Sequence, residues 1–293
     1  MSVHNDLVYA IDNRHVSLLV LLDLSAAFDT VDHDILLSIL ANRFSIQGLA
    51  LDWFRSYLAN RTQTFALAGK HTVSYSVDCS VPQGSVLGPL GFISYTEDIV
   101  DVIEWHSVLP HIYADDTQLL ASAKPEDSSR LRQQLSDCVA DVTQWCSSRR
   151  LQLNADKTEA IWIGSRAAIN KLSSQDRSLT VGTGTTINPS DVVRDLGVLF
   201  DSELTMKKHI AKVAAVCFFH IRRLRQIRRR VGKDVTIRLV LALITPRLDY
   251  CNSVFAGLPQ ATLEPLGLQR VQNAAARLVF DLRHRDHVSP YDT

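Results

Sequence analysis

A nearly unbroken apolar run, VSLLVLL at 16–22, ends directly at Asp23. Leucine- and valine-rich runs of this length are typical of β-strands that are buried on both faces. The run is too short to cross a membrane, which takes roughly 20 apolar residues in a helix. An acid at the end of a buried strand is costly unless its charge is matched. The sequence therefore predicts a buried strand that ends at a carboxylate in need of a counter-charge.

A second acidic feature is the pair Asp115-Asp116. The surrounding sequence, LPHIYADDTQLLAS at 109–122, consists of two short, mostly apolar stretches that meet at the pair. This pattern predicts a β-hairpin with the two acids at its turn. If Asp23 joined them, three carboxylates would repel one another, and a divalent cation such as Mg²⁺, which prefers hard oxygen ligands, would relieve the repulsion.

Two other interpretations fit the same acids. Aspartate is a favoured turn residue, so a solvated pair is the simpler explanation of Asp115 and Asp116 taken alone. Receiver domains of response regulators also combine an acid pair with a strand-end Asp, but there the pair comes first, whereas here Asp23 precedes it. The spacing of the acids favours a metal site only weakly over these alternatives. The sequence around the acids has to distinguish between them.

The rest of the chain predicts a mixed α/β body followed by a basic helical lobe. Asp32 is a good N-cap for a helix to about residue 43, and a stripe from Leu131 to Trp145 has the spacing of a core-facing helix. The Ser-, Thr-, Gly- and Asn-rich stretch 165–190 is the best candidate for a linker. We further expect helices near 53–58, 86–103, from 206 on, 234–256 and 261–282, a hairpin at 62–77, and strands at 160–164 and 195–200.

The charges are unevenly distributed although the formal net charge is zero. Residues 1–200 hold 15 Lys and Arg against 23 Asp and Glu, whereas residues 201–250 hold 12 against 4. An acidic body with a basic segment suggests a cation bound in one place and a polyanion in another. On charge alone, a solvated charged helix is the simpler explanation of the basic segment.

Composition excludes several classes of protein. Hydrophobic residues make up 46% of the chain and charged residues 21%, which is ordinary for a soluble globular protein. The five cysteines show no CxxC spacing, which favours reduced intracellular thiols over a disulfide framework or a zinc site. The amino terminus does not resemble a secretory signal. We therefore expect an intracellular protein, in the nucleus or the cytoplasm, without a membrane partner.

Five stretches follow one another along the chain: LVLLDLSAAFDTVDHDILL at 19–37, VPQGSVLGPL at 81–90, YADD at 113–116, LQLNADKTEAIWIG at 151–164 and DLGVLF at 195–200. Together they resemble the successive palm motifs of non-LTR (LINE-type) retrotransposon reverse transcriptases, nearest to the jockey-like branch. The tail RLDYCNSVFAGLP, followed by LQRVQNAAARLVF, also looks like the carboxy-terminal region of that group. Any one of them is moderate evidence, and five in order are strong.

The resemblance implies an α+β fold: a palm with an antiparallel sheet and packed helices, followed by a helical, thumb-like region. It divides the chain into a palm carrying motifs A to D at 1–165, a linker with a primer-grip turn at 166–202, and a basic helical thumb with the carboxy-terminal region at 203–293. It implies RNA-directed DNA polymerase activity on an RNA template, a DNA primer and deoxynucleoside triphosphates. Protein partners are not indicated.

The same resemblance assigns the metal site. Asp23, Asp115 and Asp116, with the backbone carbonyl of Leu24, would hold two Mg²⁺ ions, or Mn²⁺ in their place, in two-metal nucleotidyl transfer. Lys157 looks like the lysine that protonates the leaving pyrophosphate. An ordinary lysine in an exposed turn is an equally good explanation of that residue.

Further roles follow residue by residue. Phe28 would be the steric gate beneath the sugar, although core packing explains it more simply. Gln83 and Gly84 would touch the template base and the incoming nucleotide, although PQG also fits a plain break between strand and helix. Tyr113 would line the primer end. Leu196 and Gly197 match the primer-grip turn.

The arginine-rich stretch IRRLRQIRRR at 221–230 would lie along backbone phosphates, and a nuclear localisation signal is the competing explanation. The phosphate contacts would come from Arg222, Arg223, Arg228 and Arg229.

Two departures from the family pattern stand out. Gly91 interrupts the helix after the second motif, where the family has Leu-Leu-Phe. The fingers region that normally precedes Asp23 and the endonuclease domain are missing, so we expect a truncated reading frame. A catalytically inactive remnant that only binds nucleic acid is therefore the alternative to an active polymerase, and a fragment without selected function is a more distant one.

Overall fold

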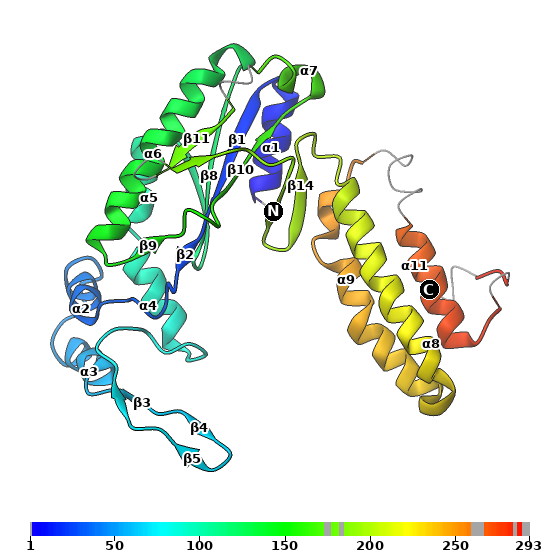
Figure 1. Ribbon diagram of the computed structural model, residues 1–293, viewed down its shortest axis with the longest axis horizontal. Coiled ribbons are helices and arrows are strands. Elements are labelled where there is room, and N and C mark those ends of the chain that lie inside the picture. Colours follow the sequence, from blue (N-terminus) through cyan, green and yellow to red (C-terminus); the bar gives the residue numbers. More distant parts are fainter. Residues whose placement is uncertain (1, 173–176, 182–184, 259–266, 284–285, 289–293) are drawn as a thin grey trace. The chain divides into compact units, whose positions relative to one another are not determined.

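The computed structural model describes residues 2–172, 177–181, 185–258, 267–283 and 286–288 (Figure 1). The chain forms two compact units. One comprises residues 9–190 and the other residues 1–8 together with 191–293. The boundaries expected at 165/166 and 202/203 lie on either side of this division.

The larger unit is built on an antiparallel sheet of four strands in the order β10-β1-β8-β7. The central strand β1 (Val16–Leu22) pairs with β8 (Asp116–Ala123) on one side and with β10 (Glu159–Ile163) on the other. The edge strand β7 (Leu109–Tyr113) pairs with β8. All but one of the β1 residues are buried, which confirms the expected strand with two covered faces.

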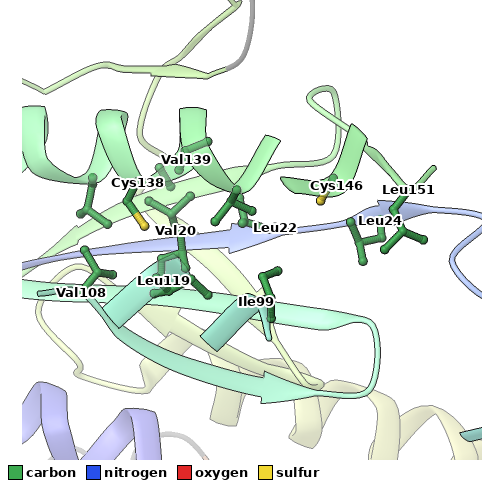
Figure 2. Close-up of a cluster of buried hydrophobic side chains, with 14 of the residues drawn as sticks. Val20, Leu22, Leu24, Ile99, Val108, Leu119, Cys138, Val139, Cys146 and Leu151 are labelled. Carbon is green, nitrogen blue, oxygen red and sulfur yellow. The ribbon is translucent and has the colours of Figure 1, made fainter. Parts of the chain in front are cut away.

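Helix α6 (Ser128–Ser148) packs against this sheet through the predicted stripe. Leu131, Leu135, Cys138 and Val142 are all at most 2% exposed. They belong to one apolar cluster with alternate residues of β1, such as Val20 and Leu22, which Figure 2 shows beneath the helix. This cluster is the core that fixes the orientation of β1 and β8.

Further helices of this unit surround the cluster. Asp32 caps α2 as predicted, because its carboxylate accepts a hydrogen bond from the Ile35 amide at 2.9 Å. Gly91 lies inside α4, where an added Cβ would come within 3.3 Å of Val81 Cγ1. The helices are α1 (Ser2–Asp12, whose first turns belong to the other unit), α2 (His33–Asn42), α3 (Leu49–Leu58), α4 (Leu87–Thr96), α5 (Ile99–Trp105) and the 3₁₀ turn Pro125–Asp127.

The hairpin expected at 62–77 is present and exposed. It consists of two short ladders, β3 (Thr62–Gln63) with β6 (Tyr75–Ser76) and β4 (Ala66–Leu67) with β5 (Lys70–His71). All residues of these four strands are exposed to solvent.

The stretch 165–190, expected as a linker, forms packed structure in its described residues. In its described residues, α7 (Arg166–Ile169) is followed by the hairpin β11 (Leu179–Val181) and β12 (Thr185–Ile187). Leu172, Leu179 and Ile187 are buried in the same cluster as the sheet residues. These few apolar residues dock a polar segment onto the body, so it is packed structure rather than a tether. Residues 173–176 and 182–184 lie outside the described part of the chain.

The smaller unit contains a hairpin and a helical lobe. The hairpin is β13 (Val192–Asp195) and β14 (Val198–Asp201). The long helix α8 (Lys207–Leu243) has a break at Gly232, whose φ of 77° is not helical. A short helix α9 (Thr245–Asp249) and a 3₁₀ turn (Asn252–Phe255) replace the continuous helix expected to 256.

Helix α11 (Leu268–Phe280) packs along α8 and completes this lobe. Their shared core includes Cys217, Ile221, Val271 and Leu278. The first part of the helix expected at 261–282 lies among residues 259–266, outside the described residues. Of the helices that the structure describes, none is both long and apolar enough to span a membrane.

Candidate active site

The antiparallel pairing of β1 and β8 brings the three predicted acids to one edge of the sheet. Leu22 at the end of β1 lies opposite Thr117 near the start of β8. One step further along the two strands are Asp23 and Asp116. Asp115 is the neighbouring turn residue. The three acids therefore meet because of the strand register. Leu22, the last residue of β1, pairs with Thr117, the second residue of β8, so the residues next to this pair come together.

The turn between β7 and β8 is short and strained. Tyr113 pairs with Asp116, which leaves only Ala114 and Asp115 in the turn. Ala114 has a φ of 56°, a region that non-glycine residues avoid at a cost of about 1–2 kcal/mol. A positive φ at the first turn position fits the tight turns that match the twist of a hairpin. The backbone thus holds Asp115 directly beside Asp116.

The charges of the three acids act on one another. The pKa of Asp116 is raised above its ordinary 3.8, first by partial burial and then by the negative charges of Asp115 and Asp23. Part of the Asp116 side chain still reaches solvent. One carboxylate oxygen of Asp23, Oδ2, is buried and accepts no hydrogen bond. An under-coordinated carboxylate beside two others is an arrangement that a hard divalent cation fits.

These acids form an open set of oxygen donors. Within the described part of the chain, no group of three or more His, Cys, Asp or Glu side chains is gathered closely enough to form a ready metal cage. The donor chemistry fits Mg²⁺, which usually keeps water or phosphate in several of its positions and seldom occupies an all-protein cage.

The raised pKa of Asp116 has a consequence for stability. The folded state disfavours the ionised form of Asp116. The free energy of unfolding therefore falls as pH rises from about 3.8 through the raised pKa of Asp116, and below about pH 3.8 this residue causes no loss. We expect Asp116→Asn to raise the melting temperature at pH 7 and to have little effect near pH 3. Thermal denaturation of both proteins across this pH range measures the difference, and an equal shift at both pH values would contradict the explanation.

Lys157 lies against Asp23. Its Nζ is 3.3 Å from the buried Asp23 Oδ2, without hydrogen-bond geometry, and its side chain is 67% exposed. The turn that carries it is fixed to the same strand, because the amide of Asn154 donates to the carbonyl oxygen of Asp23 at 2.8 Å. Just beyond, β2 (Leu24–Ser25) pairs with β9 (Gln152–Leu153). Lys157 is thus an exposed turn lysine whose ammonium group lies beside Asp23.

Two of the predicted nucleotide-binding residues, Phe28 and Gln83, have side-chain partners in the fold. The half-buried ring of Phe28 stacks on Phe92, with 4.7 Å between centroids and 20° between planes. This contact is the packing role that the sequence left open for Phe28. Gln83 Nε2 donates to Asp29 Oδ1 at 3.3 Å, and Gly84 has a φ of 76°, which a side chain would strain. Tyr113, 67% exposed, lies on the strand that leads into the acidic turn.

Leu196 and Gly197 belong to the smaller unit. They form the two-residue turn between β13 and β14, and both have positive φ, 43° and 89°. The predicted turn is therefore present, with Gly197 at a position that favours glycine.

The predicted phosphate-contacting arginines have different environments. A groove of about 870 Å³ runs between α8 and α11. Three of the four predicted arginines line it, namely Arg222, Arg228 and Arg229. Arg225, Arg270 and Arg277, which the sequence did not single out, line it as well. Arg225 could have been found, because it follows Arg222 by three residues and precedes Arg229 by four, so that all three share a helix face. Arg270 could not, because its place depends on how α11 packs.

Arg228 and Arg223 each have a partner within the protein. Arg228 is 16% exposed, donates to the carbonyl oxygens of Leu278 and Val279 at the end of α11, and pairs with Asp281 at 2.9 Å. Arg223 lies over the ring of Phe219, 5.5 Å from its centroid. Arg228 thus holds α11 against α8.

Comparison with known proteins identifies relatives for nearly the whole chain. Residues 3–199 match the family model "Reverse transcriptase (RNA-dependent DNA polymerase)". The probable RNA-directed DNA polymerase from transposon BS of Drosophila melanogaster is 26% identical over 94% of this chain and 30% of its own length. The RNA-directed DNA polymerase from mobile element jockey of the same species is 26% identical over 86% of this chain and 27% of its own length. The chain thus spans less than a third of these relatives.

Solved structures give weaker likenesses. Apo telomerase from Candida tropicalis, truncated from its C-terminal domain, has 13% identity and a TM-score of 0.48 over 69% of this chain and 38% of that one. Telomerase from the same organism in complex with a fragment of telomeric RNA has 10% identity and a TM-score of 0.49 over 99% and 51% of the two chains. At these values the likeness supports no statement about function.

The family model covers more than half of the chain, and its matched residues include the whole antiparallel sheet and the three aspartates. The α+β architecture that the motifs implied is the one observed, an antiparallel sheet with packed helices followed by a helical lobe. The chain belongs to the reverse transcriptase (RNA-dependent DNA polymerase) family, and its relatives place it with the LINE-type, jockey-like members.

Proposed function

We propose that this chain extends the 3′ end of a DNA primer along an RNA template, adding deoxynucleotides by nucleotidyl transfer. The observation that carries the proposal is the meeting of Asp23, Asp115 and Asp116 at one edge of the sheet, where the pKa of Asp116 is raised and a buried oxygen of Asp23 has no hydrogen bond. Members of the family generally use divalent metal ions, and such a donor set suits them.

In this proposal Asp23, Asp115 and Asp116, with the carbonyl oxygen of Leu24, hold two Mg²⁺ ions, which Mn²⁺ can replace. The ions, when bound, stabilise the attacking 3′-oxygen and the leaving pyrophosphate oxygen during in-line transfer. The aspartates fix where the α-phosphate sits. The tight β7–β8 turn keeps Asp115 and Asp116 in place while the primer end arrives.

Lys157 supplies a proton in this scheme. The 3′-hydroxyl loses its proton to solvent as its oxygen bonds to the α-phosphorus, and the bond from that phosphorus to the bridging oxygen breaks. The Nζ of Lys157 donates a proton to the departing pyrophosphate. What supports the role is the distance of 3.3 Å between Nζ and Asp23 Oδ2, which places the ammonium group beside the proposed reaction centre. The exposed side chain of Lys157 would be free to move from Asp23 toward the pyrophosphate if Asp23 held a metal ion.

The substrates are proposed to lie along the residues next to the acids. Tyr113 contacts the primer end, and Phe28 lies under the sugar of the incoming nucleotide. The stacking of Phe28 on Phe92 would give its ring the rigidity that a shape filter needs. Gln83 and Gly84 contact the template base and the nucleotide, and the Leu196–Gly197 turn grips the primer.

The α8–α11 groove is proposed to hold nucleic-acid phosphates through Arg222, Arg225, Arg229 and Arg270. Their support is that all four line one groove. Of the other two arginines in the expected set, Arg228 lines the groove but is bound to the end of α11, and Arg223 is not among the lining residues. Such contacts give affinity that does not depend on sequence and that falls with salt.

The groove assignment makes a measurable prediction. Arg225→Ala and Arg270→Ala should each weaken binding of a primer–template duplex and reduce the slope of log K against log salt by roughly one. Arg223→Ala, with the same loss of charge outside the groove lining, should change the slope less. Fluorescence anisotropy at several salt concentrations measures the slopes, and equal changes in all three variants would argue against the groove.

Arg228 should behave differently. Its truncation removes charge-assisted hydrogen bonds to the end of α11, so Arg228→Ala should destabilise the smaller unit by about 1.5–3 kcal/mol. Denaturant unfolding of this variant beside Arg222→Ala, whose side chain is exposed, measures the difference. Equal stability of the two variants would show that Arg228 does not anchor α11.

Primer extension with purified protein tests the polymerase proposal. A DNA primer annealed to an RNA template, with four deoxynucleoside triphosphates and Mg²⁺, should yield products up to the template end. Binding of the duplex without any extension would instead favour a remnant that only binds nucleic acid, for which the arginine-lined groove is the supporting feature.

A further inference from the structure

The β13–β14 turn is held by a tyrosine that lies 54 residues further along the chain. The hydroxyl of Tyr250, directly after α9, donates to the carbonyl oxygen of Leu196 at 2.5 Å. The same side chain covers the second turn residue, because a Cβ placed on Gly197 would lie 3.4 Å from Tyr250 Cε1. One side chain therefore contacts both residues of the turn, within a single compact unit.

The turn has a backbone conformation that needs outside support. Leu196 has a φ of 43°, which is uncommon for a bulky residue. Its side chain is 37% exposed, so burial of that side chain does not account for the conformation. Strained residues persist where their surroundings over-determine them, and Tyr250 supplies such contacts to both turn residues.

The hydrogen bond selects one orientation of a peptide group. Positive φ at both Leu196 and Gly197 is the pattern of a type I′ turn. Rotation of the central peptide would convert it to a type II′ turn and point the Leu196 carbonyl away. A donor fixed on that carbonyl opposes the rotation, and the ring beside Gly197 limits movement of the turn as a whole.

We propose that Tyr250 is a positioning residue for the primer end, because its hydroxyl fixes the central peptide of the Leu196–Gly197 turn in the orientation that grips the 3′-terminal nucleotide. The proposal rests on the proposed polymerase function and on the primer-grip role of this turn. Tyr250 acts through the turn and is not itself a catalytic residue.

Tyr250→Phe is the decisive variant, because it keeps the ring beside Gly197 and removes only the hydroxyl. We expect kcat for single-nucleotide addition to fall about tenfold, since a small displacement of the primer 3′ end from its reactive position strongly lowers the rate. The KM for the nucleotide and the affinity for the primer–template should stay unchanged. Tyr9→Phe, at a 73% exposed position on α1, is the matched control and should behave as the original protein.

A second readout does not depend on turnover. A 2-aminopurine base at the primer 3′ terminus reports by its fluorescence how that base is stacked when the duplex is bound. Tyr250→Phe should change this signal at saturating protein, and Tyr9→Phe should not. If the original protein adds no nucleotide but Tyr250→Phe still changes the signal, the positioning role stands and the polymerase proposal fails.

Two results would overturn the positioning role. One is identical kcat and fluorescence for Tyr250→Phe, Tyr9→Phe and the original protein. The other is a fall in kcat that is matched by an equal loss of primer–template affinity or of folded protein, which would make Tyr250 a purely structural residue.

Discussion

Asp115→Asn is expected to reduce RNA-templated primer extension by a factor on the order of 10³ or more, because a neutral amide cannot balance the divalent ions on which the proposed transfer depends. The substitution is nearly isosteric, and Asp115 is held by the backbone of a two-residue turn. The fold and the affinity for the primer–template should therefore be retained. Initial rates of extension, measured at equal concentrations of folded protein, give the factor.

A matched control distinguishes an effect at the acidic site from a general effect of the lost charge. Asp12→Asn removes the same charge at an exposed position at the end of α1 and should leave extension unchanged. If Asp115→Asn and Asp12→Asn extend the primer equally, Asp115 does not belong to the reaction centre. If both lose activity, a general effect of charge explains the loss.

Leu119→Ala is expected to lower the stability of the larger unit by about 2–5 kcal/mol, since it leaves a cavity in a fully buried cluster. Leu119 lies on β8, three residues after Asp116, and Figure 2 shows it within this cluster. Urea denaturation followed by tryptophan fluorescence measures the change, because the buried Trp162 lies in the same sheet.

The control for this change lies on the exposed hairpin. Leu67 is 82% exposed, so Leu67→Ala should alter stability by no more than about 0.5 kcal/mol. A loss below about 1 kcal/mol for Leu119→Ala would mean that the sheet relaxes around the cavity and that the cluster does not set the position of β8.

Local patterns predicted much of the fold. The apolar run at 16–22 gave a strand with two covered faces, and the stripe from Leu131 to Trp145 gave α6. Asp32 caps its helix, and the acid pair lies at a hairpin turn as expected. Each of these features depends on residues close in sequence, so periodicity and turn chemistry suffice to find it.

Features that depend on distant residues were missed. The stretch 165–190 looked like a linker because its buried residues, Leu172, Leu179 and Ile187, are sparse among polar ones. Their burial comes from docking onto the sheet and α6, which no local pattern encodes. The engagement of Arg228 by the end of α11 and the contact of Tyr250 with Leu196 likewise join residues about 50 positions apart.

In the candidate site, too, some features follow from local sequence and others depend on contacts between distant residues. The sequence named the three aspartates, but only the register of β1 and β8 shows how they meet. From the sequence, Lys157 could be an ordinary turn lysine or a proton donor. In the structure its ammonium group lies 3.3 Å from Asp23 Oδ2. For Phe28, the stack on Phe92 establishes packing, and a role as a steric gate stays a prediction.

The most direct test of the central claim is a single-turnover assay that follows addition of one labelled deoxynucleotide to a DNA primer on an RNA template. The account predicts addition of the complementary nucleotide alone, a requirement for Mg²⁺ or Mn²⁺, and no product with Asp115→Asn. Saturated binding of the primer–template by folded protein, with no nucleotide added at any metal concentration, would contradict it.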